Sequence, residues 1–340
     1  MTTRRTFNTL LATIPMVALM STAALSQEMR NVTFAQPSPS AINSFPVFVA
    51  IGEGFFEEEG LNVTVEAING SGPVLQSLAA GQAQFGRPGP GPVLAAHTRG
   101  VQPVFIYNLA ARSNFGVVVR EESDIQGPED LRGKVVGTGT ADGAEVGFAR
   151  NVMSSAGMTD GVDYEFLTVG DGGPATVGFT TGAIDAYSSS TADAAILNQR
   201  GMAVRDITPP EFARFFGNGI VTMRETIDSD PELVEKFIRA FARGHAFALD
   251  DANREAVLGH LREGNRQEGE DAEFQSALFD AVRAQTIPAD MSNGLGYQPP
   301  EVWEEWQDSL VAGGEMPAPL EDLTVAYTND FSAMANEAMQ

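Results

Sequence analysis

Polar side chains suited to binding a small molecule recur in this sequence where short apolar runs give way to turns rich in Gly, Ser and Pro. Arg87 follows the run Ala83–Phe85, and Tyr187 and Ser188 end a similar run. Hydroxyl, amide and guanidinium groups form hydrogen bonds and ion pairs, so these positions predict recognition without bond making. The candidate ligand-binding residues are Gln36, Ser38, Asn43, Phe45, Ser71, Gly72, Arg87, Thr138, Thr140, Tyr187, Ser188 and Asn218.

Each candidate also has a purely structural interpretation. A surface arginine is usually solvated, whereas an Arg87 that faces a cleft would bind an anion through two parallel hydrogen bonds. Ser71 suits the position before a helix, and Thr138 and Thr140 could cap a helix instead of bonding a ligand. Tyr187 could both stack on a ligand and donate a hydrogen bond to it. Both interpretations stay open at this point.

The composition excludes several kinds of chemistry. The sequence has no Cys, which removes thiolate catalysis, disulfides and cysteine-ligated metal. Its three histidines, His97, His245 and His260, share no ligand spacing, and no Ser/His/Asp or phosphate-loop arrangement is present. Lys and Arg number 21 against 45 Asp and Glu, and the resulting net charge of −24 argues against nucleic acid as a partner. We therefore expect no catalytic residue, no metal and no cofactor.

Residues 1–26 have the three-part pattern of an export signal. Arg4 and Arg5 precede the apolar run Leu10–Met20, and small residues up to Ser26 suit a cleavage site. The apolar run has 11 residues, too few to span a bilayer, which takes about 20. The two arginines also fit a twin-arginine signal, so both export routes stay open. We expect a mature chain that is exported, soluble and periplasmic.

The elements that must position the candidate residues alternate between strands and helices. Apolar side chains recur at helical spacing over 45–60, and Gly60 suits the left-handed end of that helix. Residues 61–65 alternate between apolar and polar types, which is typical of a strand. Strands and helices continue to alternate as far as residue 110. This is the pattern of a parallel sheet covered by helices.

The same order of elements recurs over residues 130–187. Residues 80–85 and 181–186 each place a glycine between a predicted helix and a short strand. This repeat predicts two similar lobes, joined by hinge strands at 114–120 and 217–223. The expected division is a signal peptide at 1–26, lobe 1 at 27–113 plus 222–340, and lobe 2, including the hinge strands, at 114–221.

The last third of the chain is predicted to be mostly helical and to return to lobe 1. One helix is expected to begin at Pro231. Trp303 and Trp306 lie three residues apart on another helix and are expected to pack on lobe 1. The charged segment 259–273 is expected to be exposed, and its acidic residues at 263–273 lack the spacing of a calcium loop. Asp193 is expected to cap a helix.

Five runs of the mature chain, taken in order, resemble a known family. They are Gly52–Val63, Leu78–Gln82, Asp130–Gly137, Thr181–Ala186 and Asp230–Val234. With these runs behind an export signal, the chain resembles a periplasmic solute-binding protein of an ABC importer. Within that class it is similar to the group that binds nitrate, sulfonates, taurine and thiamine precursors.

The resemblance implies an α/β chain with a two-lobed periplasmic-binding-protein fold, type II-like, and a ligand held between the lobes. It also implies a monomer that meets the membrane only through an ABC permease. Arg87 and nearby helix N-termini favour a small organic or inorganic anion such as a sulfonate, taurine or nitrate. Phe45 and Tyr187 favour the alternative, a thiamine-precursor pyrimidine or another aromatic solute. A sensory role and a pyrimidine-forming enzyme on the same fold are further alternatives, although enzymes of that kind use a Cys-rich motif.

Overall fold

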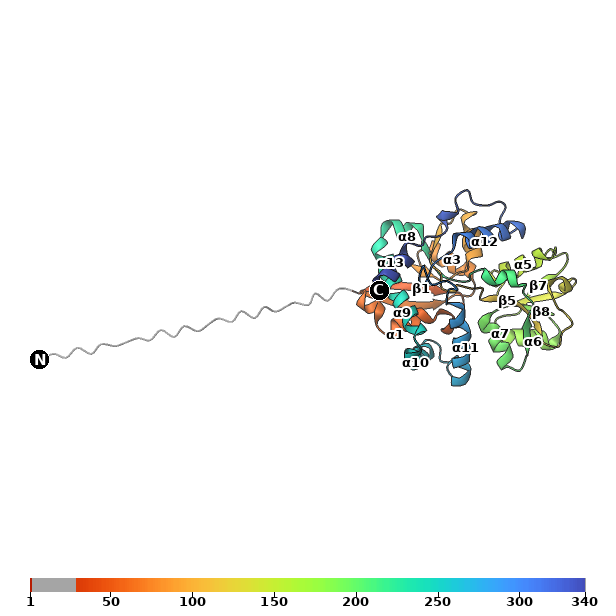
Figure 1. Cartoon of the computed structure of the whole chain (residues 1–340), viewed down its shortest axis with the longest axis horizontal. Coiled ribbons are helices and arrows are strands. Elements are labelled where there is room, and N and C mark those ends of the chain that lie inside the picture. Colours follow the sequence, from red (N-terminus) through yellow and green to blue (C-terminus); the bar gives the residue numbers. More distant parts are fainter. Residues whose placement is uncertain (2–28, 340) are drawn as a thin grey trace.

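The chain folds into two α/β lobes, each built around a five-stranded sheet. We describe it from a computed structural model, which places Met1 and residues 29–339. Figure 1 shows the two lobes side by side, with β5, β7 and β8 in the second lobe and β1 in the first. The predicted export signal lies outside the described residues. No helix among the residues described is both long and apolar enough to cross a membrane.

The sheet of lobe 1 has the strand order β2-β1-β3-β10-β4. Strands β1, β2 and β3 run parallel, whereas β10 is antiparallel to both of its neighbours. Apolar residues from both faces of this sheet are buried, as expected when helices cover a sheet on both sides. The strands are β1 (Arg30–Gln36), β2 (Leu61–Ala67), β3 (Phe85–Gly86), β4 (Pro103–Tyr107) and β10 (Ile220–Met223).

The sheet of lobe 2 repeats this plan in the order β7-β6-β8-β5-β9. Its parallel strands are β6, β7 and β8, and β5 is antiparallel to β8 and β9. The repeated glycine segments predicted from sequence therefore lead into equivalent strands, β3 and β8. The strands are β5 (Phe115–Arg120), β6 (Val135–Thr138), β7 (Glu165–Thr168), β8 (Ala186–Ser190) and β9 (Val204–Asp206).

The helices connect the parallel strands and then form the C-terminal third of the chain. In lobe 1 and lobe 2 they are α1 (Phe45–Gly52), α2 (Phe55–Glu58), α3 (Ser71–Ala79), α4 (Pro90–His97), α5 (Ala144–Ser155), α6 (Gly173–Thr181) and α7 (Thr191–Gln199). The C-terminal helices are α8 (Arg224–Ser229), α9 (Pro231–Leu249), α10 (Arg254–Gly264), α11 (Ala272–Gln285), α12 (Pro300–Ala312) and α13 (Asp330–Ala338).

The single helix predicted over 45–60 is interrupted. It is two helices, α1 and α2, because Gly54 adopts a φ of 76° that most side chains disfavour and that ends the regular helical path. Gly60 has a φ of 75° and ends this segment, as predicted. The helix expected at Pro231 is also confirmed, and the Asp230 side chain caps it by accepting a hydrogen bond from the Leu233 N–H.

The chain passes between the lobes twice, just before β5 and just before β10. The two passages are hydrogen-bonded to each other, because the Gly217 N–H donates to the Ala110 carbonyl at 2.8 Å and the Ala110 N–H donates to the Asn218 carbonyl at 3.1 Å. The predicted hinge strands are therefore regular sheet strands, β5 in lobe 2 and β10 in lobe 1, each fourth in the order of its sheet. The residues that cross between the lobes come just before these two strands. A paired crossing of this kind suits a hinge about which the lobes rotate.

Trp303 and Trp306 fix one side of this crossing. Trp303 packs edge-on against Phe105 of β4 and against Phe216, with ring centroids 5.3 and 5.0 Å apart. The Trp306 indole N–H donates to the Phe216 carbonyl at 3.2 Å. Helix α12 therefore packs on lobe 1, as predicted, and also holds the passage that returns from lobe 2.

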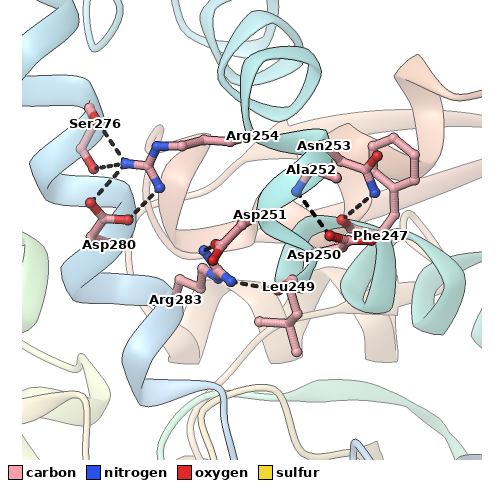
Figure 2. Close-up of polar contacts among 10 residues, drawn as sticks. All are labelled: Phe247, Leu249, Asp250, Asp251, Ala252, Asn253, Arg254, Ser276, Asp280 and Arg283. Carbon is pink, nitrogen blue, oxygen red and sulfur yellow. Dashed lines mark hydrogen bonds and ion pairs between the residues drawn. The ribbon is translucent and has the colours of Figure 1, made fainter.

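Helix α11 is anchored to lobe 1 through a corner between α9 and α10 (Figure 2). The Arg254 guanidinium donates to both carboxylate oxygens of Asp280, at 2.6 and 2.7 Å. Arg283 donates to the carboxylate of Asp251 at 2.6 Å and to the carbonyl of Leu249. Since α11 also contacts α7, it links the C-terminal region to lobe 2.

Candidate ligand-binding cleft

A cleft with a volume of about 1040 Å³ lies between the lobes. Its walls are loops that follow β1, β2 and β3 of lobe 1 and β6, β7 and β8 of lobe 2. These loops stand at the carboxyl ends of parallel strands, where ligands bind in open α/β sheets. Residues of the segment 265–274, between α10 and α11, complete the rim.

Six of the predicted site residues line this cleft. They come from both lobes and from the crossing between them, so the sequence positions converge in space as a binding site requires. They are Ser38, Asn43, Ser71, Arg87, Thr140 and Asn218.

Four predicted residues lie beneath the cleft instead of lining it. The Tyr187 ring is fully buried, and its hydroxyl donates to the Gly170 carbonyl at 3.3 Å. Ser188 donates to the Glu145 carbonyl at 2.7 Å. Thr138 lies in β6 beside Thr168. Phe45 is buried edge-on against Phe279, 5.4 Å away.

Gln36 and Gly72 also fall outside the cleft lining. Gln36 is the last residue of β1 and is buried inside lobe 1. Gly72 faces lobe 2, where a Cβ at this position would collide with the Asp142 carboxylate. These six residues are outside the lining of the cleft, and a role for them in binding stays a prediction.

Arg87 is the cation of lobe 1's wall. Its backbone continues β3 by donating to the Ala35 carbonyl at 3.0 Å, and the Asn218 amide donates to its carbonyl at 3.1 Å. Its Nε donates to the Ser44 hydroxyl at 2.8 Å. Arg87 is almost completely buried, at 4% exposure. Even so, it forms no ion pair with any of residues 29–339. Burial lowers the Arg87 pKa to about 10, which leaves it charged at neutral pH.

A buried cation without a partner is costly unless an anion compensates it. The guanidinium can present two parallel N–H groups to a carboxylate, sulfonate or nitrate. In the same cleft lining, Asn218 Oδ1 and Ser38 Oγ are buried atoms that have no hydrogen-bond partner among the residues described. Buried polar atoms are normally paired, so these atoms mark where a bound molecule would be held.

The wall formed by lobe 2 is acidic. Burial and repulsion from Asp171 and Asp193 raise the pKa of Glu145 to about 7. Burial and repulsion from Asp193 raise the pKa of Asp171 to about 6, and burial raises that of Asp193 as well. The N-cap of α7 is Ser190 and not Asp193 as expected. The Asp193 carboxylate completes the capping box by accepting hydrogen bonds from the Ser190 N–H and hydroxyl. Glu145 and Asp171 were not among the predicted site residues.

The segment between α10 and α11 adds further acidic groups at the rim. The Glu268 carboxylate accepts hydrogen bonds from the Ala41 and Ile42 N–H groups, at 2.9 and 3.3 Å. Asp271 caps α11 by accepting from the Glu273 and Phe274 N–H groups, both at 3.0 Å. Most of the acidic residues in this segment are exposed, as expected, whereas Glu268 folds back onto lobe 1.

The lobes are in direct contact beside the cleft. A Cβ at Gly89, which precedes α4, would collide with the Cβ of Ala144 at the start of α5. Arg150 of α5 pairs across the lobes with Glu315 at 3.2 Å. Helix α12 touches both α4 and α5. The two lobes thus touch at this point, where the small residues Gly89 and Ala144 permit a close approach.

Two similar lobes, a paired crossing and a cleft at the strand ends define the two-lobed periplasmic-binding-protein fold. Residues 41–255 match the family described as NMT1/THI5 like, and the chain belongs to this family. The nitrate-binding protein NrtA of Synechocystis PCC 6803 has a TM-score of 0.68 at 13% identity, over 92% of this chain and 90% of NrtA. The alkanesulfonate-binding protein SsuA of Xanthomonas axonopodis pv. citri, bound to MOPS, has a TM-score of 0.67 at 15% identity. This match covers 88% of this chain and 99% of SsuA.

These likenesses confirm the expected family group and fold, and they give the chain the architecture of a substrate-binding protein of the ABC-importer type. The riboflavin-binding protein RibY of Chloroflexus aurantiacus is 24% identical over 313 residues. That alignment covers 89% of this chain and 86% of RibY. The proteins named here are binders of different small molecules, so the family alone leaves the ligand open.

Proposed function

We propose that this protein captures a small solute with an anionic group in its interlobe cleft and delivers it to an ABC permease. The observation that carries the proposal is Arg87, a buried cation at the wall of the cleft that forms no ion pair with residues 29–339. A sulfonate, carboxylate or nitrate bound there would recover the electrostatic energy that burial costs the guanidinium. The alkanesulfonate and nitrate binders of the same fold support an anion of this kind.

Delivery follows from closure of the lobes. Lobe 1, whose sheet includes β10, and lobe 2 rotate about the paired crossing, and contacts from both lobes favour the closed state once the solute is bound. The permease then recognises the closed form. The export pattern in the sequence of residues 1–26 supports a periplasmic location, and we propose a monomer that meets the membrane only through the permease.

A heterocyclic solute is the second candidate. The likeness to RibY favours it, and a volume of about 1040 Å³ leaves ample room for a ring system. In this case stacking surfaces such as Phe115 and Phe274, which line the cleft, would carry the binding. A pyrimidine such as a thiamine precursor belongs to the same class.

The experiment is a binding screen on the mature protein, combined with mass spectrometry of any solute that co-purifies with it. Sulfonates, nitrate, carboxylates, aminopyrimidines and riboflavin are tested by thermal shift and then by calorimetry. An anion should bind, and Arg87→Gln should weaken it at least tenfold, because a buried charge pair is lost. Arg99→Gln, an exposed arginine of lobe 1 outside this cleft, is the matched control and should bind normally. Binding of riboflavin alone, unaffected by Arg87→Gln, would transfer support to the second candidate.

A further inference from the structure

The cleft lining carries a buried cation on one lobe and a group of carboxylates on the other. Arg87 lies on lobe 1, whereas Glu145, Asp171 and Asp193 lie on lobe 2. Arg200 of lobe 2 and the acidic residues of the segment 265–274 of lobe 1 also line the cavity. A solute with only an anionic group would satisfy Arg87 and then face three carboxylates. Because like charges in a partly desolvated cleft repel one another, the second wall discriminates against such a solute.

The carboxylates of lobe 2 keep unused hydrogen-bonding capacity. Glu145 accepts two bonds from Thr140, from its N–H at 3.3 Å and its hydroxyl at 3.1 Å, and both go to Oε1. Asp171 forms no side-chain hydrogen bond or ion pair within the part of the chain that the structure describes. Asp193, in contrast, is occupied in the capping box of α7. Glu145 and Asp171 are therefore the acceptors available to a ligand.

An independent observation also points to a ligand with a donor group. Asn218 is 4% exposed, and its amide nitrogen already donates to Arg87, which fixes the orientation of the side chain. Its Oδ1 is consequently an acceptor that lines the cleft without a donor among residues 29–339. A buried amide oxygen of this kind requires an N–H or O–H from the bound molecule.

We infer that the cleft selects a solute that is anionic at one end and carries an ammonium or similar N–H-bearing cation at the other. The anionic end pairs with Arg87 of lobe 1, and the cationic end pairs with Glu145 and Asp171 of lobe 2. One molecule then bridges the lobes and couples its own binding to closure. The inference rests on the proposed function and narrows its ligand class to amino-substituted anions, with taurine as the simplest probe.

The pH dependence distinguishes such a solute from a simple anion. Burial raises the pKa of Glu145 to about 7 and that of Asp171 to about 6, so both gain charge between pH 6 and pH 8. A bound ammonium group favours the ionised carboxylates, releases protons and binds more tightly as the pH rises. A simple anion should bind less tightly over the same interval. The other charged groups around the cleft are Arg87, Asp193, Arg200, Glu268, Glu270 and Asp271.

The test uses pairs of probes that differ in a single group. Taurine is compared with isethionate, and 3-aminopropanesulfonate with propanesulfonate, by calorimetry at pH 6 and pH 8. The amino member of a pair should bind at least about tenfold more tightly at pH 8, should gain affinity from pH 6 to pH 8, and should release protons. The member without the amino group should lose affinity over that interval.

Variants of the carboxylates complete the test. The double variant Glu145→Gln with Asp171→Asn should abolish the preference for the amino probe and should strengthen binding of the simple anion. Glu165→Gln removes an exposed charge from β7 and should keep the preference. Equal or tighter binding of the simple anion at pH 8, or a preference that survives the double variant, overturns the inference. Failure of every pair also overturns it, while the proposed function is then judged on the wider screen.

Discussion

His245 is a base that the fold accepts only in its neutral form. It is fully buried on α9, its Nδ1 lies 2.9 Å from the Tyr107 hydroxyl, and Nε2 has no partner in the described residues. Burial lowers the His245 pKa to about 3. In the unfolded chain the His245 imidazole is protonated below about pH 6.5, whereas in the folded protein it stays neutral down to about pH 3. Stability is therefore complete above pH 6.5 and is lost as the pH falls toward 3.

The expected loss is at most about 1.4 kcal/mol per pH unit below pH 6.5. His245→Gln should lower stability at pH 7.5 and should flatten the dependence between pH 6.5 and pH 4, as measured by urea unfolding. Tyr107→Phe removes the hydrogen bond and keeps the imidazole, so it should retain the steep dependence. Glu145 acts in the opposite direction but is common to all three proteins. Equal slopes for His245→Gln and the native chain would contradict this account.

Single residues show how far the sequence could predict the site. Arg87 was a candidate because it follows a short predicted strand in an acidic chain, and its sequence position alone did not decide between a solvated surface and the cleft. Thr138 and Thr140 illustrate the limit. They would share one face if the strand continued, but β6 ends at Thr138 and only Thr140, in the loop that follows, lines the cleft. Glu145 was missed because an acid in the first turn of a helix has an ordinary structural explanation.

At the scale of elements, the start of α4 approaches the start of α5 across the two lobes. Gly89 has a φ of −82°, which any residue adopts, so backbone strain does not explain the glycine. The glycine is explained by the close approach of Ala144, whose Cβ would collide with a Cβ at position 89. We expect Gly89→Ala to hold the lobes apart, to leave the stability of each lobe unchanged, and to weaken ligand binding by about tenfold, since overpacking costs about 1–3 kcal/mol.

A double-mutant cycle measures this contact. Ala144→Gly in the Gly89→Ala background should restore affinity, because the two Cβ atoms no longer compete for the same space. Gly259→Ala, in α10 with no atom within 4 Å of the added Cβ, is the control and should bind normally. Calorimetry with the solute identified by the screen gives the affinities, and scattering at saturation gives the degree of closure. Additive effects of the two substitutions would contradict a direct contact between α4 and α5.

The elements themselves were largely predictable, because apolar periodicity and Gly-Pro turns are local signals. The break between α1 and α2 was not, since Gly54 could also have been accommodated inside a helix. The return of segment 265–274 to the cleft was not predictable either. Glu268 reaches Ala41 and Ile42, more than 200 residues earlier in the chain, and no local pattern encodes such a contact.

At the scale of the whole molecule, a net charge of −24 surrounds a cleft that is proposed to hold an anionic group. The long-range field repels a simple anion during its approach, whereas Arg87 attracts it only at close range. At 0.1 M salt, interactions between exposed charges are largely screened beyond about 10 Å. Salt therefore removes the long-range repulsion and affects the contact at the site less.

The association rate of a simple anionic probe should therefore rise severalfold from 10 to 300 mM salt, the reverse of the usual result for opposite charges. A probe with no net charge, such as taurine, should show little change, because its two ends experience opposite forces. Stopped-flow measurements of closure on the mature protein give both rates. A rate that falls with salt for the simple anion would mean that Arg87 and the neighbouring helix N-termini dominate the field at the mouth of the cleft. The surface charge would then have no part in selecting between the two kinds of solute.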